Sequence, residues 1–369
     1  MKKILFCLGT RPEAIKLAPL IKYCVDNVVP FEVCLSGQHK DMIAPFMDFF
    51  KIRPDYDLEI MKHGQSLAGI TSSILLKMDN VLNKSRPDVV VVQGDTTTTY
   101  SCGLAAFYKQ IPVAHVEAGL RTGKIYSPFP EEVNRKMVSA FSSYNFTPTE
   151  QARENLKREG ILENVWVTGN TSIDALEMTL YEIKKSNLES SLRKKYKEIN
   201  FKRPYILVTT HRRENLGSPL HQICKSIKKI VEDFDVQVVF PVHLNPMVRE
   251  VIDEHLAGDE RIHLLPPLDY KDFVWIMSQA HLIMSDSGGV QEEAPHFKVP
   301  ILVLREDTER PEGIEVSVSK LVGSNSETIY AEVKKILESQ DYYNSFSVNS
   351  NPYGDGRASQ KIIDKILKC

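Results

Sequence analysis

Short apolar runs alternate with amphipathic segments along the whole chain. In the first half these runs are rich in Val, Ile, Leu and Phe with few polar interruptions, which is typical of strands buried on both faces of a parallel sheet. Because strands alternate with helices, we expect a doubly wound α/β domain. The expected strands lie at 3–8, 31–36, 88–93, 112–116 and 164–168, and the expected helices at 12–25, 66–84, 96–109 and 130–143.

The same alternation starts again after a polar stretch at 184–204. The helix expected at 219–232 carries one apolar stripe, as a helix that covers a sheet should. A second α/β domain is therefore predicted, and 369 residues suit two domains. The two halves share no visible sequence period. The expected strands of the second half lie at 205–210, 236–240, 261–265, 281–285 and 300–304, and a last helix is expected at 357–368.

Composition excludes several classes of partner. The chain is 42% hydrophobic and 25% charged with a net charge of −2, so we expect no binding to nucleic acid or to an anionic membrane. No apolar stretch approaches the roughly 20 residues of a membrane span. The six cysteines are scattered without a CxxC pair, and no carboxylate or histidine cluster has metal-ligand spacing. We expect reduced thiols, no metal and a cytoplasmic location.

The first strand ends in the loop GTRPEAIK, where Gly9 precedes a helix. Thr10 and Glu13 have capping-box spacing. The free N–H groups of the helix end, together with Arg11 and Lys16, predict an anion site. A plain turn with two surface cations is the alternative on this stretch alone.

Two carboxylates follow neighbouring strands. Asp95 comes just after the strand at 88–93, and Glu117 comes just after the strand at 112–116. Capping of the next helix is the simpler account of Asp95 taken alone. Carboxylates that converge at one sheet edge are costly unless they serve acid/base chemistry or meet cations, so the pair indicates a catalytic site.

A third acidic group lies in the segment PEEVNR. Glu131 and Arg135 fall in the first turns of the expected helix at 130–143. Acidic residues there complement the helix dipole, and residues at i and i+4 can form a surface salt bridge. Both structural accounts stay open beside a catalytic role.

The second half supplies a complementary set of groups. His211 ends the strand at 205–210 in a polar loop, a position where histidine commonly has a function. Ser287, Gly288 and Gly289 follow the strand at 281–285 and are small enough for backbone N–H groups to reach a phosphate. Arg310 follows the next strand. Since GxGxxG and GxxxxGK[ST] motifs are both absent, NAD and ATP are disfavoured. We expect a nucleoside diphosphate in a cleft between the domains.

These motifs together resemble one known family. GTRPEAIK, GDTTTT, HVEAGLRT, PEEVNR, HRREN, PVHLNP, SDSGGVQEEAP and TERPE, in this order, closely resemble the non-hydrolysing UDP-N-acetylglucosamine 2-epimerases over essentially the whole chain. The resemblance implies a GT-B-like fold of two Rossmann-like, doubly wound domains facing a central cleft. The domains would be 1–170 with the C-terminal helix 357–369, and 171–356. It further implies a homodimer that needs no cofactor.

The resemblance also assigns roles to residues of this sequence. Catalysis falls to Asp95, Glu117, Glu131 and His211. Phe273 would contact the uracil, Glu293 the ribose, and the backbone near Leu268 the nucleotide. The remaining UDP contacts would come from Arg11, Lys16, Arg135, Ser287, Gly288, Gly289 and Arg310.

The implied reaction interconverts UDP-GlcNAc and UDP-ManNAc for cell-surface polysaccharide. The C2 proton of the sugar lies next to no carbonyl, so the route without NAD expels UDP, leaves 2-acetamidoglucal and adds UDP back. It needs a base for C2–H and cations on the diphosphate. Which carboxylate is the base stays open, as do two alternatives: a hydrolysing epimerase and a GT-B glycosyltransferase.

Some segments depart from the family pattern. The stretches 315–323 and 296–300 differ from it near the expected diphosphate site. Gln38 and Gln65 match positions that hold a second UDP-GlcNAc in some relatives, whereas Asp41 and Gly64 do not. Activation by a second substrate molecule, the oligomeric state and the polysaccharide served all stay open.

Overall fold

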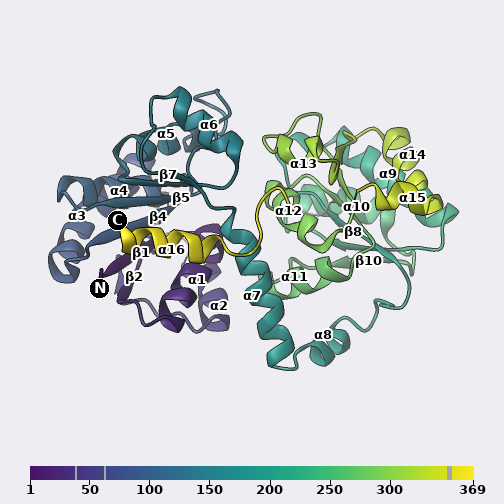
Figure 1. Ribbon diagram of the computed structural model, residues 1–369. Coiled ribbons are helices and arrows are strands. Elements are labelled where there is room, and N and C mark those ends of the chain that lie inside the picture. The colour runs from purple at the N-terminus through teal and green to yellow at the C-terminus, as the bar shows by residue number, and fades with distance from the viewer. Residues whose placement is uncertain (38–39, 62–63, 347–350) are drawn as a thin grey trace. The chain divides into compact units, whose positions relative to one another are not determined.

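The computed structural model describes residues 1–37, 40–61, 64–346 and 351–369 (Figure 1). The chain forms two compact units: unit 1 comprises Met1–Ala175 with Tyr353–Cys369, and unit 2 comprises Leu176–Pro352. Each unit holds one sheet whose neighbouring strands pair in parallel. The prediction of two Rossmann-like α/β domains is confirmed.

The sheet of unit 1 has seven strands in the order β3-β2-β1-β4-β5-β6-β7. All five strands predicted in this half are present. β3 and β6 were not predicted; in β6, Asn145 and Thr147 interrupt the apolar run although both are buried. The strands are β1 (Ile4–Leu8), β2 (Phe31–Leu35), β3 (Tyr56–Asp57), β4 (Val89–Gln93), β5 (Val113–Val116), β6 (Tyr144–Thr147) and β7 (Val165–Val167).

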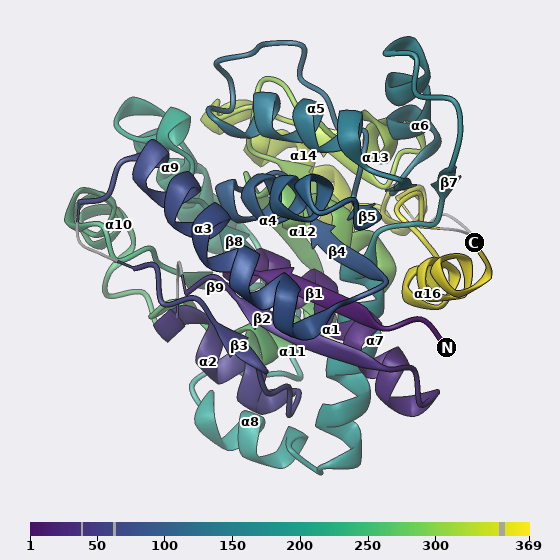
Figure 2. The same cartoon turned by 90° about the vertical axis from the view of Figure 1, so that its left-hand side faces the viewer.

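Helices cover both faces of this sheet. Helices α3, α4 and α5 lie over one face (Figure 2), where Leu5, Val90 and Met78 belong to one apolar core. On the opposite face α1 packs against α16. The helices that begin in unit 1 are α1 (Arg11–Asp26), α2 (Lys40–Phe49), α3 (Leu67–Ser85), α4 (Thr97–Tyr108), α5 (Glu131–Phe141), α6 (Glu150–Arg158), α7 (Thr171–Lys185) and α16 (Ala358–Lys368).

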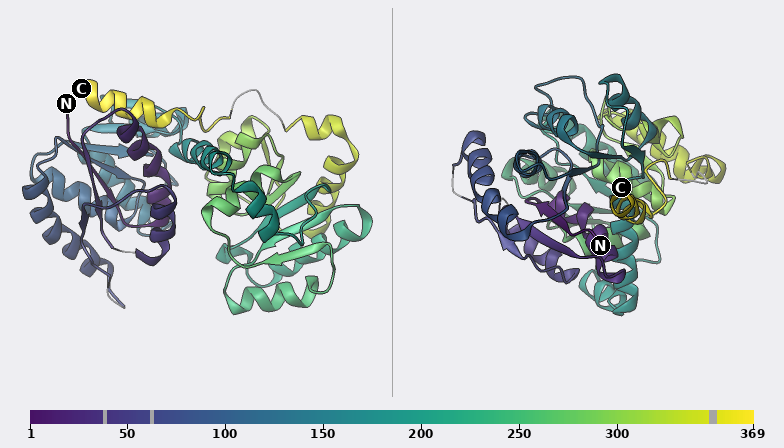
Figure 3. Two further views of the ribbon diagram at one scale, coloured as in Figure 1. Left: turned by 90° about the horizontal axis from the view of Figure 1, so that it is seen from below. Right: turned by 60° about the vertical axis from the view of Figure 1, so that its left-hand side comes forward.

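The C-terminal helix α16 is attached to unit 1 by polar contacts as well as by packing. Lys2 Nζ donates to the carbonyl of Ile366 at 3.1 Å, and the Tyr23 hydroxyl contacts Asp364 Oδ1 at 3.1 Å. The two termini lie side by side in this unit (Figure 3). The carboxylate of Asp174, on α7, accepts the first N–H groups of α16, from Ala358 at 3.2 Å and Ser359 at 2.7 Å. Asp174 thus caps a helix that is remote in sequence.

Replacing Asp174 with Ala should destabilise unit 1 by about 1–2 kcal/mol, because two buried N–H groups at the start of α16 lose their acceptor. Urea unfolding followed by circular dichroism measures the change. Asp26→Ala, at the end of α1 and exposed, is the matched control and should stay within about 0.5 kcal/mol of the wild type. Equal stabilities of the two variants would contradict the capping role.

The sheet of unit 2 has six strands in the order β10-β9-β8-β11-β12-β13. The five strands predicted in this half are present, and β13 was not predicted. Leu220, Ile223 and Ile227 of α9 are buried against this sheet as the stripe requires. The strands are β8 (Tyr205–Thr209), β9 (Gln237–Pro241), β10 (Ile262–Leu265), β11 (Leu282–Ser285), β12 (Ile301–Val303) and β13 (Ser319–Leu321).

The helices of unit 2 follow the same alternation. Those covering one face, α9, α10 and α14, share the apolar core of this unit. No helix among the described parts of the chain is long and apolar enough to cross a membrane. The α-helices are α8 (Glu189–Lys195), α9 (Ser218–Asp233), α10 (Pro246–Leu256), α11 (Tyr270–Gln279), α12 (Gly288–Glu293), α13 (Pro311–Glu315), α14 (Ser326–Glu338) and α15 (Gln340–Asn344).

Candidate active site

Glu13 ties together two loops at the carboxyl edge of the unit 1 sheet. Its buried carboxylate accepts the N–H groups of Gly9 at 2.8 Å and Thr10 at 2.6 Å, so the Glu13 half of the predicted capping box is formed. The hydroxyls of Thr96 and Thr99 donate to its other oxygen at 2.6 and 2.9 Å. Burial raises the pKa of Glu13, and these hydrogen bonds oppose that rise. Sequence reasoning gave Glu13 only a local role.

The structure brings Lys16 and Glu117 together. Lys16 Nζ forms an ion pair with Glu117 Oε2, to which Gln93 Nε2 also donates at 2.9 Å. Glu117 has φ of +65°, a left-handed conformation that is uncommon for a residue with a side chain and that recurs at functional sites. Arg11 is half-buried and makes no ion pair or side-chain hydrogen bond with the described residues. A cation at this position remains available to an anion.

Asp95 does not cap α4. The cap is Thr96, whose hydroxyl accepts the Thr99 N–H at 3.1 Å, so the simpler account of Asp95 is wrong. The Asp95 carboxylate instead forms an ion pair with Arg135, and Asn134 Nδ2 donates to the Asp95 carbonyl at 2.9 Å. The Asp95 side chain is 26% exposed. It is therefore held in place yet accessible.

Arg135 links Asp95 to a second acid, which is not the expected one. Its Nη1 lies 3.3 Å from Glu132 Oε2, and the fully buried Glu132 also accepts the N–H groups of Thr122 and Gly123 at 3.1 Å each. The surface pair between Glu131 and Arg135 is not formed. Within the described part of the chain, the half-buried Glu131 carboxylate makes no ion pair or hydrogen bond. Glu131 is thus the least constrained of the three predicted catalytic acids.

His115 forms a hydrogen bond that helps to hold the loop that carries Asp95. It is fully buried, and its Nε2 lies 2.7 Å from the carbonyl of Gly94, the residue before Asp95. Burial lowers the pKa of His115 to about 4. The ring is therefore neutral near pH 7, and because a carbonyl only accepts, its proton lies on Nε2. No signal in the sequence separated His115 from an ordinary core residue.

The low pKa of His115 predicts a loss of stability in mild acid. In the unfolded chain a histidine titrates near pH 6.5, so the native state binds fewer protons between pH 6.5 and 4. The contribution is fully present above pH 6.5 and falls by on the order of 3 kcal/mol as the pH drops to about 4. Urea unfolding across this range should show a smaller slope for His115→Gln, whereas the exposed control His243→Gln should follow the wild type. Identical slopes for both variants would contradict the assignment.

In unit 2 the buried Asp286 organises the loop that carries His211. Asp286 accepts the N–H groups of His211 and Arg212 at 3.1 and 3.0 Å, the Thr210 hydroxyl at 2.8 Å and Asn215 Nδ2 at 2.9 Å. Its Oδ1 also lies 3.1 Å from His211 Nδ1. Burial raises the pKa of Asp286, but these donors prevail and lower it to about 2. The half-exposed His211 ring is oriented through Nδ1, which leaves Nε2 for a ligand.

The predicted phosphate loop lies against Arg310. A Cβ atom on Gly288 would come within 2.8 Å of Arg310 Cζ, so the arginine packs where only glycine leaves room. Arg310 Nε donates to Glu292 Oε1 at 2.9 Å, and its Nη1 lies 2.8 Å from Glu309 Oε1. Ser287 N–H donates to Ser285 Oγ at 3.0 Å, which anchors the start of the loop. The structure therefore brings Ser287, Gly288 and Arg310 together.

Glu309 gathers three arginines beside this loop. Arg212 and Arg310 lie 2.8 Å from one carboxylate oxygen, and Arg305 lies 2.6 Å from the other. Burial raises the pKa of Glu309. The charge of Arg310, backbone hydrogen bonding and the other two arginines outweigh this effect and lower the pKa to about 2. Sequence reasoning missed Glu309, although the motif TERPE places it directly before Arg310. One carboxylate therefore contacts all three arginines.

The remaining predicted nucleotide contacts lie around α11 and α12. Leu268 is half-buried just before α11, Phe273 is half-buried near its start, and Glu293 lies at the end of α12 with 8% of its surface exposed. Leu268 and Phe273 take no part in the polar network of the phosphate loop. Gln38, which matches a position for a second substrate molecule, lies outside the described residues.

Each of the two parallel α/β units carries polar groups at its strand ends: carboxylates and cations in one, and a glycine loop beside arginines in the other. This arrangement is typical of the class of α/β enzymes that bind nucleotides. Residues 24–367 match the family model described as UDP-N-acetylglucosamine 2-epimerase. The chain belongs to this family.

Named relatives match the sequence of this chain over nearly its full length. The chain is 48% identical to UDP-N-acetylglucosamine 2-epimerase of Campylobacter jejuni, with 100% of this chain and 98% of the relative covered. It is also 48% identical to the Bacillus subtilis enzyme of the same name, with 99% and 95% covered. A crystal structure of UDP-GlcNAc 2-epimerase from Neisseria meningitidis bound to UDP-GlcNAc is similar over 100% of both chains, with a TM-score of 0.91 and 44% identity. The predicted family is confirmed.

Proposed function

We propose that this protein interconverts UDP-GlcNAc and UDP-ManNAc without hydrolysis and without a cofactor. Membership of the epimerase family supports the reaction, and a relative bound to UDP-GlcNAc supports the substrate. The observation that carries the proposal is the pairing of catalytic-type carboxylates with cations at neighbouring strand ends, Asp95 with Arg135 and Glu117 with Lys16. Each pair places a positive charge directly beside a carboxylate that could act as an acid or base.

The chemistry explains why these groups are needed. A carboxylate removes the C2 proton, the C2–H electron pair forms the C1=C2 double bond of 2-acetamidoglucal, and the C1–O bond breaks with its electrons leaving on UDP. UDP then adds back to C1 while C2 receives a proton on the opposite face. Atoms and charge balance without an oxidant. The barrier falls when cations stabilise the departing diphosphate and an acid/base pair handles the proton.

The proposed roles divide between the two sets of residues. Asp95, Glu117 and Glu131 would handle the C2 proton, while Arg11 and Lys16 would stabilise negative charge on the diphosphate. His211, oriented by Asp286, would donate to the substrate through Nε2. The nucleotide would be held by the UDP-binding set of Arg135, Leu268, Phe273, Ser287, Gly288, Gly289, Glu293 and Arg310.

Turnover in deuterated water tests this function directly. Purified protein incubated with UDP-GlcNAc alone should yield UDP-ManNAc that carries deuterium at C2, observed by proton NMR. Accumulation of free ManNAc with an equal amount of UDP would indicate the hydrolysing reaction instead. Because no acceptor is present and transfer to water would release GlcNAc, formation of the ManNAc epimer excludes a glycosyltransferase. Absence of both product and deuterium would overturn the proposal.

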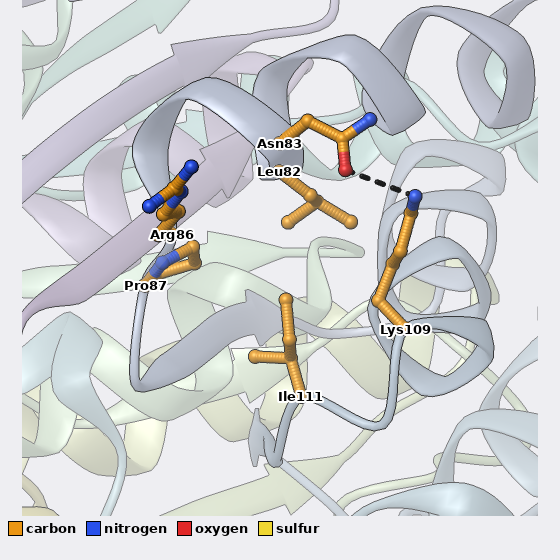
Figure 4. Close-up of a pocket in the computed structure, with 6 residues that line it drawn as sticks. All are labelled: Leu82, Asn83, Arg86, Pro87, Lys109 and Ile111. Atoms are coloured by element: carbon orange, nitrogen blue, oxygen red, sulfur yellow. Dashed lines mark hydrogen bonds between the residues drawn. The ribbon is translucent and has the colours of Figure 1, made fainter.

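We also propose that the protein is a homodimer that pairs through unit 1. Large apolar side chains are exposed on α3, α4 and α5: Leu76 (75%), Phe107 (51%), Tyr108 (68%) and Met137 (44%). A hollow of about 490 Å³ lies at the amino ends of β4 and β5 and is lined by Leu82, Asn83, Arg86, Pro87, Lys109 and Ile111 (Figure 4). An apolar surface of this kind is typical of an interface between subunits. Sedimentation equilibrium measures the mass, and a monomer at micromolar concentration would contradict a stable dimer.

The setting of the reaction is also a proposal. All six cysteines are free and five are buried, as expected in a reducing compartment, which supports a cytoplasmic location. We propose that the product supplies ManNAc units for a cell-surface polysaccharide.

A further inference from the structure

Three metal-ligating side chains meet on unit 2, and none of them belongs to the candidate active site. His221 lies in the first turn of α9, and Glu254 and His255 lie in the last turn of α10. One ligand atom from each falls within 4.8 Å of the others. Sequence spacing gave no sign of this group, because His221 lies far from Glu254 in the chain and only the packing of α9 on α10 joins them.

The two histidines face each other through their ring nitrogens. His221 Nδ1 lies 2.8 Å from His255 Nε2, and the rings meet edge to face with centroids 5.0 Å apart. At this distance one ring nitrogen donates its proton to the lone pair of the other. A divalent metal ion can take the place of that proton. With Zn–N bonds of about 2.0–2.1 Å in tetrahedral geometry, the nitrogens would need to separate by only roughly 0.5 Å.

Glu254 is the third member of this group, and its side chain is exposed. Its carboxylate lies at the surface, so it can rotate toward an ion held by the two half-buried imidazoles. Two imidazoles and one carboxylate suit Zn²⁺, Co²⁺, Ni²⁺ or Cu²⁺ better than Mg²⁺ or Ca²⁺, which prefer oxygen ligands only. An open fourth position would remain for water or another ligand.

We propose that His221, Glu254 and His255 form a binding site for one divalent transition-metal ion, which bridges α9 and α10. The site uses none of the residues assigned to epimerisation, so it is independent of the proposed function. A bound ion would hold two helices of the unit 2 core together and thus stabilise this unit against unfolding.

Titration of the full chain with ZnCl₂ tests the site. Experiments use metal-free protein in a Cys369→Ser background, because Cys369 is the exposed thiol and would bind zinc itself. Calorimetry should show one Zn²⁺ per chain. His221→Ala and His255→Ala should each weaken binding by at least about 10-fold. His243→Ala, an exposed histidine of the same unit, should bind as the parent does.

Two further readouts separate coordination from a structural effect. Zinc should raise the unfolding temperature of the parent but not that of His255→Ala, each compared with its own metal-free temperature. Cu²⁺ bound to the parent should give an electron paramagnetic resonance spectrum with two nitrogen ligands, and His255→Ala should lose one. The metal-free epimerisation rate of His255→Ala should equal that of the parent. Unchanged zinc affinity in both histidine variants, or no binding by the parent, would overturn the proposal.

Discussion

Replacing Asp95 with Asn should lower the turnover number by about 10²–10⁴, the contribution of a positioned acid or base. The amide keeps the size of the side chain but can neither accept a proton nor balance the charge of Arg135, with which Asp95 forms an ion pair. Stability should change little, because Asp95 is partly exposed and α4 is capped by Thr96 instead.

Initial rates of UDP-ManNAc formation and thermal unfolding measure the two effects separately. Asp79→Asn is the matched control: this exposed aspartate of α3 is also paired with a cation, Lys109, and should keep the full rate. Glu117→Gln and Glu131→Gln, assayed beside Asp95→Asn for deuterium exchange at C2, compare the three candidate bases. A rate within two-fold of the wild type for Asp95→Asn would remove Asp95 from the catalytic set.

Replacing Arg310 with Ala should reduce kcat/KM by at least about 100-fold and should weaken UDP binding itself. Charge-assisted hydrogen bonds from arginine to phosphate are among the strongest polar contacts, and Arg310 lies directly against the phosphate loop. Arg310 forms ion pairs with Glu292 and Glu309, so a diphosphate would compete with these carboxylates for it. The substitution also leaves the buried Glu292 without this cation.

Binding of UDP alone distinguishes this role from that of Asp95. Calorimetry should show at least about 10-fold weaker UDP binding for Arg310→Ala and unchanged binding for Asp95→Asn, because only the first contact is to phosphate. Arg203→Ala is the matched control, since Arg203 is a partly exposed arginine paired with Asp235. Gly288→Ala should weaken UDP binding as well, because its Cβ would push the Arg310 guanidinium aside. Wild-type UDP affinity in Arg310→Ala would refute the placement.

Most of the fold could be predicted because buried parallel strands are continuous apolar runs, and ten such runs became strands within two residues of their expected ends. Strands that break this rule were missed. β6 carries Asn145 and Thr147 inside the core and β3 has only two residues. β13 reads Ser-Lys-Leu, so it has a single apolar residue. Periodicity cannot show that a polar side chain is buried, because its partners come from elsewhere in the chain.

Only part of the candidate site could be predicted from the sequence. Asp95, Glu117 and His211 could be singled out because each directly follows an apolar strand. The residues that hold these side chains in place could not be singled out. They are His115, Glu132, Asp286 and Glu309, and nothing in the local sequence distinguishes a structural acid or histidine from a functional one. Three of these four have a pKa lowered to about 4 or to about 2, and each of those values depends on burial together with groups brought in by folding.

The sequence by itself determined two α/β halves, the strand ends at which polar groups gather, and the family resemblance that the comparisons confirmed. Only the tertiary structure decided which charges pair: Arg135 with Asp95 rather than Glu131, Lys16 with Glu117, and three arginines with Glu309. It also decided that His221 meets His255. The physical reason is the range of the interactions. Apolar burial follows the local period of a strand or helix, whereas an ion pair depends on which remote segments the sheet order and helix packing place within about 4 Å of each other.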